Sequence, residues 1–520
     1  MNSPTQLILN NFKHSLIIGA SFSFSFMLFT IPFLAGRIKP DAEESQEDYL
    51  AAATLSITML SMIAAISYSG LYAMGMIVSN NYGRLHRSNL QQSTINDSEA
   101  PLPDDLTIKR EIEHTLQAGL LLSSAISIPA ISTLFFSGDI LRACGQKPNI
   151  AALAQEFLRP YSFAMLALLA RICIELIALS FKKRTPLMVI ALTNFVIGTV
   201  LSGLFCFYFA LNMSGIAYGY LIEAYATAGF FAAYLAYAKV FQSYHFFKKL
   251  SVGPDTRQKI GEIVTRGWPI ALTFGVESAA VWATSIFAGL LGTDQQIAIG
   301  LCSQFYFFAL IFILACGQYN AQEIADSIGS KDYHAAIAKA RYGLLATNLL
   351  LLPSCILVAA YPSVLQWIST NAELNDNIQQ MLTILGPMIS CMVLADATGY
   401  GMLSGLRSMQ ENSQDNFRTN LLPTAFSVLS TGLGIMLSYA LGLHTNLDIY
   451  GIALGYAVGL VLRGLGLGYL WTREINTLQT KITEAGNPTE LTPLMRTNPP
   501  PQTACCPALW SLCKTKPAYA

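Results

Sequence analysis

The apolar residues of this chain come in long, nearly uninterrupted blocks that are separated by short polar or Gly- and Pro-bearing stretches. A helix needs about 20 mostly apolar residues to cross the hydrocarbon layer of a membrane. Continuous hydrophobicity over such a length is typical of helices rather than of strands, in which apolar and polar side chains alternate. We therefore expect twelve transmembrane helices, which cover approximately residues 14–36, 50–78, 112–137, 152–181, 186–210, 215–241, 266–292, 296–325, 340–363, 379–406, 417–442 and 449–472.

The composition also indicates a membrane protein. Of the 520 residues, 53% are hydrophobic and 12% are charged, whereas soluble domains carry about 25% charged residues. These values exclude a string of soluble modules and a disordered scaffold. Lysine plus arginine and aspartate plus glutamate each number 31, so no nucleic-acid partner is expected. We expect a multi-pass protein of the cell membrane, in particular the bacterial inner membrane, in contact with membrane lipid.

The basic residues predict how the chain is oriented. With the N-terminus in the cytoplasm, 24 of the 31 basic residues fall in cytoplasmic segments and 4 in external ones. The other three, Arg159, Arg171 and Arg463, lie within predicted helices. Cytoplasmic segments of membrane proteins carry an excess of Lys and Arg. This bias requires an even number of crossings, so both termini are expected in the cytoplasm.

Two pairs of short motifs indicate that the chain is built from a duplicated unit. Gly215-Ile-Ala-Tyr-Gly-Tyr220 matches Gly451-Ile-Ala-Leu-Gly-Tyr456 at five of six positions, with an offset of 236 residues. Gly70-Leu-Tyr72 similarly matches Gly317-Gln-Tyr319. Each pair occupies corresponding places in successive sets of six predicted helices, as a repeat requires. Because six is even, the two halves have the same orientation and form parallel repeats.

The predicted fold class is therefore all-α, a polytopic membrane protein with two six-helix lobes around a central cleft. A basic segment between the sixth and seventh helices is the natural cytoplasmic linker. The C-terminal segment is polar and contains Pro and Cys, a composition typical of disorder. The predicted organisation is an N-lobe over residues 1–241, a linker over 242–265, a C-lobe over 266–473 and a cytoplasmic tail over 474–520.

Two acidic residues are predicted deep inside the C-lobe. Glu277 lies 11 residues from Arg266, and Asp396 lies 11 residues from Arg407, with the arginines taken as the cytoplasmic edges of their helices. At a rise of 1.5 Å per residue, both carboxylates are about 16 Å deep in a layer of about 30 Å. A carboxylate at that depth costs about 2.5–3.5 kcal/mol and needs a partner or a function. Glu277 and Asp396 can share a sodium ion or hold a proton, so they are the ion-coupling candidates.

Four stretches, taken in order, together resemble one known family. They are Lys183-Arg-Thr-Pro186 with Asn194, Gly267-Trp-Pro-Ile-Ala-Leu-Thr-Phe-Gly-Val-Glu277, Ile328-Gly-Ser-Lys-Asp-Tyr333 and Asp396-Ala-Thr-Gly-Tyr-Gly-Met-Leu-Ser-Gly-Leu-Arg407. They look like the fourth-to-fifth turn and the fifth, seventh, eighth and tenth helices of the multidrug and toxin extrusion (MATE) transporters, which belong to the MOP flippase superfamily.

The resemblance runs over most of residues 14–472. It implies a cation-coupled exporter of amphipathic, often cationic drugs that is related to lipid-oligosaccharide flippases. It also carries over Glu277 and Asp396 as the cation-linked site of the C-lobe. Many bacterial members have an Asp in the first helix as an N-lobe proton site, whereas residues 14–36 contain no acidic residue here. This departure favours the C-lobe pair.

Four further polar residues within predicted helices are candidates for secondary coupling or for the cleft. Arg171 and Glu175 are spaced i, i+4 and can pair on one helix face, as a structural pair or as part of the cleft. Glu223 has no obvious local partner and could be a second coupling or substrate-binding acid. Asn194 matches a family position and is equally suited to an interhelical hydrogen bond.

Aromatic residues are the candidates for substrate contact, because a ring attracts a cation by about 0.5–2 kcal/mol. The candidates are Trp282, Tyr306 and Tyr400 in the C-lobe and Tyr161 and Tyr220 in the N-lobe. Aromatic residues make up 11% of the chain, so packing or lipid contact is the competing interpretation for each one.

The function that fits these features is a secondary active multidrug exporter, which exchanges amphipathic or cationic small molecules for H⁺ or Na⁺ by alternating access. A flippase of a lipid-linked oligosaccharide is the alternative, but it would need a basic cleft, for which Arg159, Arg171 and Arg463 are the candidates. A membrane-embedded enzyme is disfavoured because the sequence has no zinc-binding His pair and no Gly-x-Ser-x-Gly elbow. We expect no catalytic residues, no cofactor, no metal beyond Na⁺ at Glu277 and Asp396, and a monomer.

Overall fold

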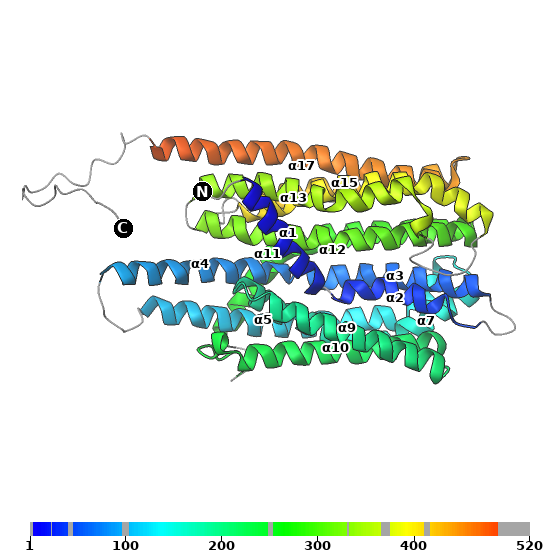
Figure 1. Cartoon of the computed structure of the whole chain (residues 1–520), viewed down its shortest axis with the longest axis horizontal. Helices are drawn as coiled ribbons and strands as arrows, with labels where there is room; N and C mark the ends of the chain where they lie inside the picture. Colours follow the sequence, from blue (N-terminus) through cyan, green and yellow to red (C-terminus); the bar gives the residue numbers. More distant parts are fainter. Residues whose placement is uncertain are drawn as a thin grey trace, which may run out of the picture.

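The computed structural model describes residues 4–21, 23–39, 45–95, 103–247, 253–329, 332–365, 375–409 and 417–486, and the regular secondary structure in these ranges is helical (Figure 1). Most of the predicted tail, with its cysteines, lies outside the described residues. The main helices are α1 (Pro4–Ser21), α2 (Ser23–Ala35), α3 (Gln46–Ser69), α4 (Tyr72–Ile95), α5 (Pro103–Phe135), α6 (Ser137–Ala143), α7 (Pro148–Tyr161), α8 (Ala164–Ser180), α9 (Thr185–Gly203), α10 (Asn212–Tyr237), α11 (Pro254–Leu291), α12 (Thr293–Gly329), α13 (Tyr333–Ala360), α15 (Asp376–Ser408), α16 (Leu422–Leu443) and α17 (Asp448–Gly486).

The helices cover the twelve blocks predicted from the sequence. Within the described ranges, nine helices are long and apolar enough to cross a membrane, and α7 and α8, which meet at 53°, together make a tenth candidate. The two remaining blocks are occupied by α10 and by α1 followed by α2. The all-helical membrane fold is therefore confirmed, and twelve crossings stay a prediction. Helix α11 begins at Pro254, so the second half of the predicted linker forms its first turns.

Helix α3 shows how the sequence starts an interior helix. The Ser45 hydroxyl accepts a hydrogen bond from the Asp48 N–H at 3.2 Å, and the Asp48 carboxylate accepts one from the Ser45 N–H at 3.2 Å. This capping box satisfies donors that the first turn of a helix leaves unpaired. Every residue from Tyr49 to Leu60 is buried, which fits a helix that is apolar on all its faces.

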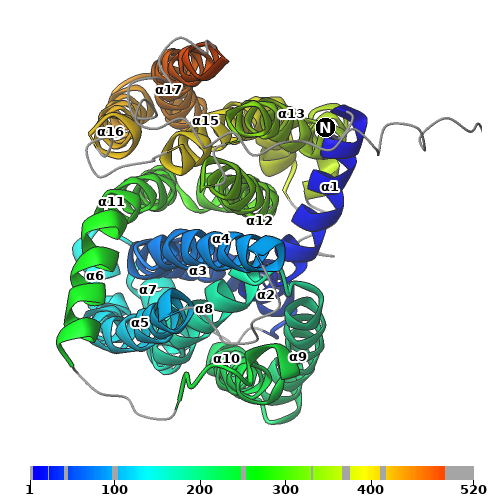
Figure 2. The ribbon, with the colours of Figure 1, turned by 90° about the vertical axis from the view of Figure 1, so that its left-hand side faces the viewer.

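The chain forms two bundles that lie side by side (Figure 2). Helices α2–α10 make the N-terminal bundle, and α11–α17 make the C-terminal bundle (Figure 1). The two bundles meet where α11 packs along α3 and where α12 packs on α3 and α4. Helix α1 crosses from one bundle to the other, because it contacts α9 and also α12 and α13. The start of α1 and the end of α17 lie toward the same end of the molecule (Figure 1), and the cytoplasmic placement of both termini stays a prediction.

The repeated Gly-Ile-Ala-x-Gly-Tyr motif has the same structural role in both bundles. Its second glycine is Gly219 in α10 and Gly455 in α17, and a Cβ atom at these positions would lie 2.3 Å and 2.2 Å from the backbone nitrogens of Ser202 and Ser438. The Ser202 hydroxyl donates to a carbonyl of α10 at 3.0 Å, and the Ser438 hydroxyl donates to a carbonyl of α17 at 2.8 Å. Small residues at helix contacts allow the backbones to approach closely in membranes. The duplication thus preserves one tight helix-pair contact.

Ion pairs join the two bundles at the end predicted to be cytoplasmic. Lys182 Nζ lies 3.4 Å from Asp326 Oδ2, and Arg184 Nη2 lies 3.9 Å from Glu323 Oε1. Within the C-terminal bundle, Lys339 Nζ lies 3.0 Å from the other oxygen of Glu323. The two basic residues follow α8, whereas both acids belong to α12. Ion pairs therefore link the two bundles at the end that is predicted to be cytoplasmic.

Polar contacts join the bundles at the opposite end as well. The Gln296 side-chain amide donates to Gln146 Oε1 at 3.1 Å, and both side chains are buried. Nearby, Lys147 Nζ donates to the Thr293 hydroxyl at 2.7 Å. The space between the bundles is thus flanked by contacts at both ends.

The tight contact between α16 and α17 generates a stability prediction. We expect Gly455→Ala to lower the free energy of unfolding by about 1–3 kcal/mol, because the added methyl group overlaps the backbone of α16. Gly464→Ala is the matched control on the same helix, because a Cβ atom there meets nothing within 4 Å. Thermal unfolding of the detergent-purified variants measures both effects, and equal unfolding temperatures for the two variants would contradict the prediction.

Candidate functional site

Three charged side chains meet inside the C-terminal bundle. Glu277 lies on α11, Asp396 on α15 and Arg463 on α17, and all three are buried. Arg463 donates from Nη1 to Glu277 Oε1 and from Nη2 to Asp396 Oδ1. Its Nη2 also lies 3.3 Å from the backbone carbonyl oxygen of Asp396. The guanidinium therefore bridges the two carboxylates, and we call these three residues the charged triad.

The guanidinium has room in this position because residue 399 is a glycine. A Cβ atom at Gly399 would lie 3.0 Å from both Nε and Nη2 of Arg463. Gly399 is one turn of α15 beyond Asp396, so the arginine lies across the surface of α15 between its acidic partner and this glycine. A larger residue there would push the arginine away from Asp396.

Two tyrosines complete the surroundings of Asp396. The Tyr306 hydroxyl, from α12, donates to Asp396 Oδ2 at 2.7 Å and lies 3.5 Å from the Tyr456 hydroxyl of α17. Both tyrosines line a cavity of about 40 Å³ within the bundle, which has room for a few water molecules. Both oxygens of Asp396 are thus hydrogen-bonded, whereas among the described residues Glu277 is bonded through Oε1 alone.

The charged triad can take up one further positive charge. With both acids ionised, two negative charges face one positive charge, so the net charge is negative. Among the described residues, no group of three or more His, Cys, Asp or Glu side chains gathers where a metal ion could be held. A cation bound at the triad would rely on the oxygens of its two carboxylates.

The structure brings together the two acids that the sequence placed at one depth, and it adds the arginine between them. From the sequence, Arg463 was a candidate only for a basic cleft. The sequence did indicate that Arg463 needs an acidic or polar partner, because a charged residue within a membrane requires one. Arg463 shares its half of the chain with Glu277 and Asp396, but the sequence does not show which helices are neighbours.

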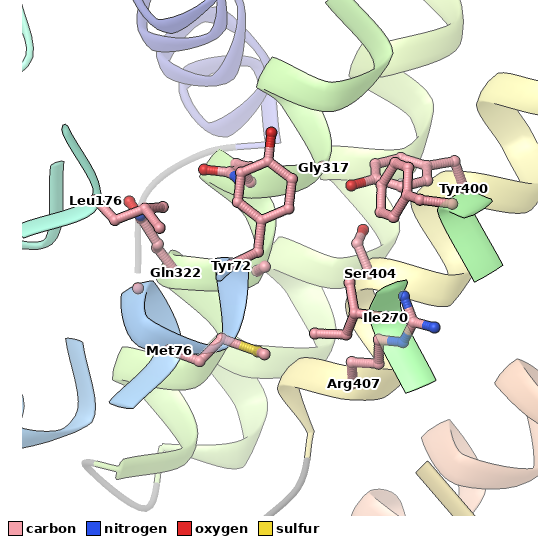
Figure 3. Close-up of a pocket in the computed structure, with 13 residues that line it drawn as sticks. Tyr72, Met76, Leu176, Ile270, Gly317, Gln322, Tyr400, Ser404 and Arg407 are labelled. Carbon is pink, nitrogen blue, oxygen red and sulfur yellow. The ribbon is translucent and has the colours of Figure 1, made fainter. Parts of the chain in front are cut away.

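A separate cavity lies between the two bundles (Figure 3). Tyr72 of α4 faces it from the N-terminal bundle, opposite Tyr400 and Ser404 of α15 (Figure 3). The Phe274 ring of α11 also lines it and lies 5.4 Å from the Tyr400 ring. The cavity measures about 60 Å³, far below the roughly 300–1,000 Å³ of drug-binding pockets. The bundles must part before a drug-sized molecule can enter.

The charged residue that lines this central cavity is Arg407, which the sequence placed at a membrane edge. Arg407 lies in the last turn of α15 and is buried where α11, α15 and α16 meet, so this end of the helix also forms part of the cavity wall. Its Nη2 donates to the Thr273 hydroxyl at 2.8 Å and to the Thr424 hydroxyl at 3.1 Å, and lies 3.4 Å from the Pro269 carbonyl oxygen. The arginine therefore joins three helices beside the cavity.

Tyr72 and Arg407 are residues of the cavity that the sequence analysis did not select. The sequence signal that could have identified Tyr72 is the repeat motif to which it belongs. Gly70-Leu-Tyr72 and Gly317-Gln-Tyr319 were interpreted only as evidence of duplication. The structure places Tyr72, Gly317 and Gln318 on the wall of the central cavity. The duplicated motifs thus contribute to the same space from opposite bundles.

The four secondary candidates lie in the N-terminal bundle, away from the charged triad. Arg171 Nε lies 3.8 Å from Glu175 Oε2, and both side chains line a cavity of about 40 Å³. Glu223 on α10 accepts a hydrogen bond from the Thr227 hydroxyl at 2.9 Å. Asn194 is buried on α9. The structure therefore pairs Arg171 with Glu175 and places Glu223 in a hydrogen bond within its own helix.

The five aromatic candidates occupy different environments. Tyr400 lines the central cavity, and Tyr306 bonds to the charged triad. Tyr161 stacks on a phenylalanine of α7 with 5.5 Å between ring centroids, and the Tyr220 hydroxyl lies 3.2 Å from a threonine hydroxyl of α9. Trp282 packs against the hydrophobic core. Tyr400 is therefore the candidate that is placed to meet a molecule between the bundles.

Comparisons with known proteins agree on one kind of protein. The MatE family model matches residues 108–204, which run from α5 to the residue after α9. "Probable multidrug resistance protein NorM" of Brucella suis is 25% identical over 386 residues, which cover 70% of this chain and 77% of that protein. "Multidrug resistance protein NorM" of Burkholderia vietnamiensis is 24% identical over 368 residues, which cover 68% of this chain and 75% of that protein.

Solved structures share the fold at lower sequence identity. The structure described as "Crystal structure of eukaryotic MATE transporter AtDTX14" has a TM-score of 0.72 at 14% identity, and the match covers 92% of this chain and 100% of that one. An "outward-facing conformation of a multidrug resistance MATE family transporter of the MOP superfamily" has a TM-score of 0.70 at 15% identity, with 92% and 97% covered. The arrangement of helices is therefore shared over nearly the whole described chain.

The hydrogen bond from Tyr306 to Asp396 generates a prediction. We expect Tyr306→Phe to lower the free energy of unfolding by about 1–3 kcal/mol, because a buried carboxylate loses a donor. Tyr469→Phe is the control, since Tyr469 is exposed on α17. Thermal unfolding in detergent compares the two variants, and an unchanged Tyr306→Phe protein would show that this hydrogen bond contributes little.

Proposed function

We propose that this chain is a MATE-type multi-pass membrane transporter, as its likeness to the MatE family model, to NorM proteins and to solved MATE structures supports, and that it exports amphipathic small molecules, many of them cationic, in exchange for H⁺ or Na⁺. The coupling cation binds at Glu277 and Asp396, and the substrate binds between the two bundles. This is a proposal for a multidrug efflux antiporter that works by alternating access.

The observation that carries the proposal is that α11 and α15 each contribute residues both to the central cavity and to the charged triad. Helix α11 contributes Phe274 to the central cavity and Glu277 to the charged triad, and α15 contributes Tyr400 and Asp396 in the same way. Phe274 and Glu277 are three residues apart, and Asp396 and Tyr400 are four apart. A change in the charge of the triad therefore acts on the helices that form the substrate wall, which is what coupling requires.

The central cavity is suited to flat amphipathic molecules. Tyr72, Phe274 and Tyr400 provide ring faces, with about 6.1 Å between the rings of Tyr72 and Phe274. Aromatic rings contact apolar groups and attract cations. As the bundles part, these rings become accessible from one side of the membrane, and the contacts at the opposite end remain closed.

A flippase for a lipid-linked sugar has weaker support. Such a protein needs basic side chains available for a diphosphate. Arg463 is bonded to two carboxylates, and Arg171 faces Glu175. Arg159, the third predicted candidate, lies over the ring of Phe135 with 4.3 Å to its centroid. Arg407 lines the central cavity, but its guanidinium already donates to the hydroxyls of Thr273 and Thr424. These contacts favour the exporter.

Substitution of the proposed coupling acid tests the function. We expect Glu277→Gln to abolish active efflux of ethidium from cells, because a glutamine side chain cannot bind and release the coupling cation. Glu262→Gln is the control on the same helix, since Glu262 pairs with basic residues at the predicted cytoplasmic surface. Efflux is measured by fluorescence at matched protein levels. Wild-type efflux from the Glu277→Gln variant would exclude this residue from coupling.

The proposed substrate wall yields a separate prediction. We expect Tyr400→Ala to raise the KM for ethidium about threefold to tenfold, because the cation loses one ring contact of about 0.5–2 kcal/mol. Tyr439→Ala, on the exposed face of α16, is the control. The KM of each variant is measured from the concentration dependence of transport in proteoliposomes. Equal KM values for the two variants would place the substrate elsewhere.

A further inference from the structure

We propose that Arg463 is a tethered cation that holds the coupling site in its unloaded state and makes the site selective for H⁺ over Na⁺. In this role Arg463 is a positioning residue, since it acts through Glu277 and Asp396 rather than on the substrate. The inference rests on the proposed function and goes beyond it by naming the ion and the residue that selects it.

Arg463 already occupies the place of a shared cation. Its two terminal nitrogens donate to one oxygen of Glu277 and one oxygen of Asp396, and the side chain is fully buried. A sodium ion between the same carboxylates would lie against the guanidinium. Two positive charges in a medium of low dielectric constant repel strongly. The arginine therefore excludes Na⁺ from the position between the two acids.

A proton, unlike a sodium ion, needs only one free carboxylate oxygen. Asp396 uses both carboxylate oxygens in hydrogen bonds, to Arg463 and to Tyr306. Among the described residues, Glu277 is hydrogen-bonded through Oε1 alone. Its side chain is 10% exposed, compared with 2% for Asp396. The geometry thus makes Glu277 the proton carrier and Asp396 the fixed anchor of the arginine.

The charged triad is not neutral when both of its acids are ionised. Two carboxylates and one guanidinium leave a single excess negative charge, so one proton on Glu277 makes the triad neutral. A neutral group of side chains is the least costly arrangement inside a membrane. The loaded state therefore holds one proton, with the Arg463–Asp396 pair intact.

Four other ionisable groups lie around Glu277 and are not part of the charged triad. Three of these groups are tyrosines and one is an arginine, and they come from α12, α15 and α17. A tyrosine that donates a hydrogen bond is neutral. Arg407 is held by threonine hydroxyls of α11 and α16. These groups are Tyr306 on α12, Tyr400 and Arg407 on α15, and Tyr456 on α17.

Proton loading has a mechanical consequence for the interface. A protonated Glu277 is no longer an anionic acceptor for Arg463, so the contact between α11 and α17 weakens while the one between α15 and α17 remains. Helix α11 is also the helix that packs along α3 of the other bundle. A proton thus loosens the attachment of an interface helix to its own bundle.

The test uses the full-length protein reconstituted in liposomes, with ethidium as the transported probe. A pH gradient without Na⁺ and a Na⁺ gradient at equal pH are imposed separately. We expect wild-type transport to respond to the pH gradient only. In Arg463→Gln the site has two acids and no guanidinium. We therefore expect Na⁺-driven transport to rise about tenfold above background, because the guanidinium no longer repels Na⁺. Arg463→Lys should keep the wild-type ion preference, and Arg473→Gln, at an exposed position of α17, is the control.

A second measurement reports ion binding without transport. The unfolding temperature of detergent-purified protein is compared in NaCl and in choline chloride at one ionic strength and pH. We expect no difference for wild type and a higher unfolding temperature in NaCl for Arg463→Gln. If Arg463→Gln does not fold, the wild-type protein still decides, because stabilisation or transport driven by Na⁺ in wild type overturns the inference. An Arg463→Gln variant with the wild-type ion response overturns it as well. Absence of ethidium transport under either gradient would instead contradict the proposed function.

Discussion

A guanidinium held between two carboxylates inside an apolar helix bundle is the interaction on which this molecule's proposed chemistry depends. Removing one partner of such a buried group leaves an uncompensated charge, which typically costs about 3–5 kcal/mol. Glu277, Asp396 and Arg463 come from three helices that are far apart in sequence. Their bonds therefore fix how α11, α15 and α17 lie relative to one another, and a charge change at any member alters that arrangement.

The same helices explain how a site within one bundle communicates with the space between the bundles. Phe274 and Tyr400 line the central cavity from α11 and α15, about one helical turn from Glu277 and Asp396. A shift of α11 or α15 moves a residue of the central cavity and an acid of the charged triad together, so no chain of intermediate contacts is needed between the two sites. Polar contacts link the bundles at each end, as in the Lys182–Asp326 and Gln146–Gln296 pairs. The proposed alternating access requires these two sets of contacts to open in turn.

Close helix packing supplies the rigidity that this coupling needs. Gly455 lets α17 approach the backbone of α16, and Gly219 lets α10 approach α9 in the same way. A bundle held by such contacts moves as a unit, so loosening one helix has a consequence at the interface. The preservation of this pair of contacts in both halves fits a fold in which two similar bundles rock against each other.

The sequence by itself determined the properties that follow from local composition and periodicity. Long apolar blocks predicted the membrane helices, the repeated Gly-Ile-Ala-x-Gly-Tyr motif predicted the duplication, and the cost of burying charge identified Glu277 and Asp396. These conclusions need no knowledge of which helices touch. Only the tertiary structure decided that Arg463 joins the two acids, that Arg407 is buried beside the central cavity and that Tyr72 faces Tyr400. The reason is physical: an uninterrupted apolar helix can pack in many rotations with almost equal burial, so its sequence does not specify which neighbour a given side chain meets.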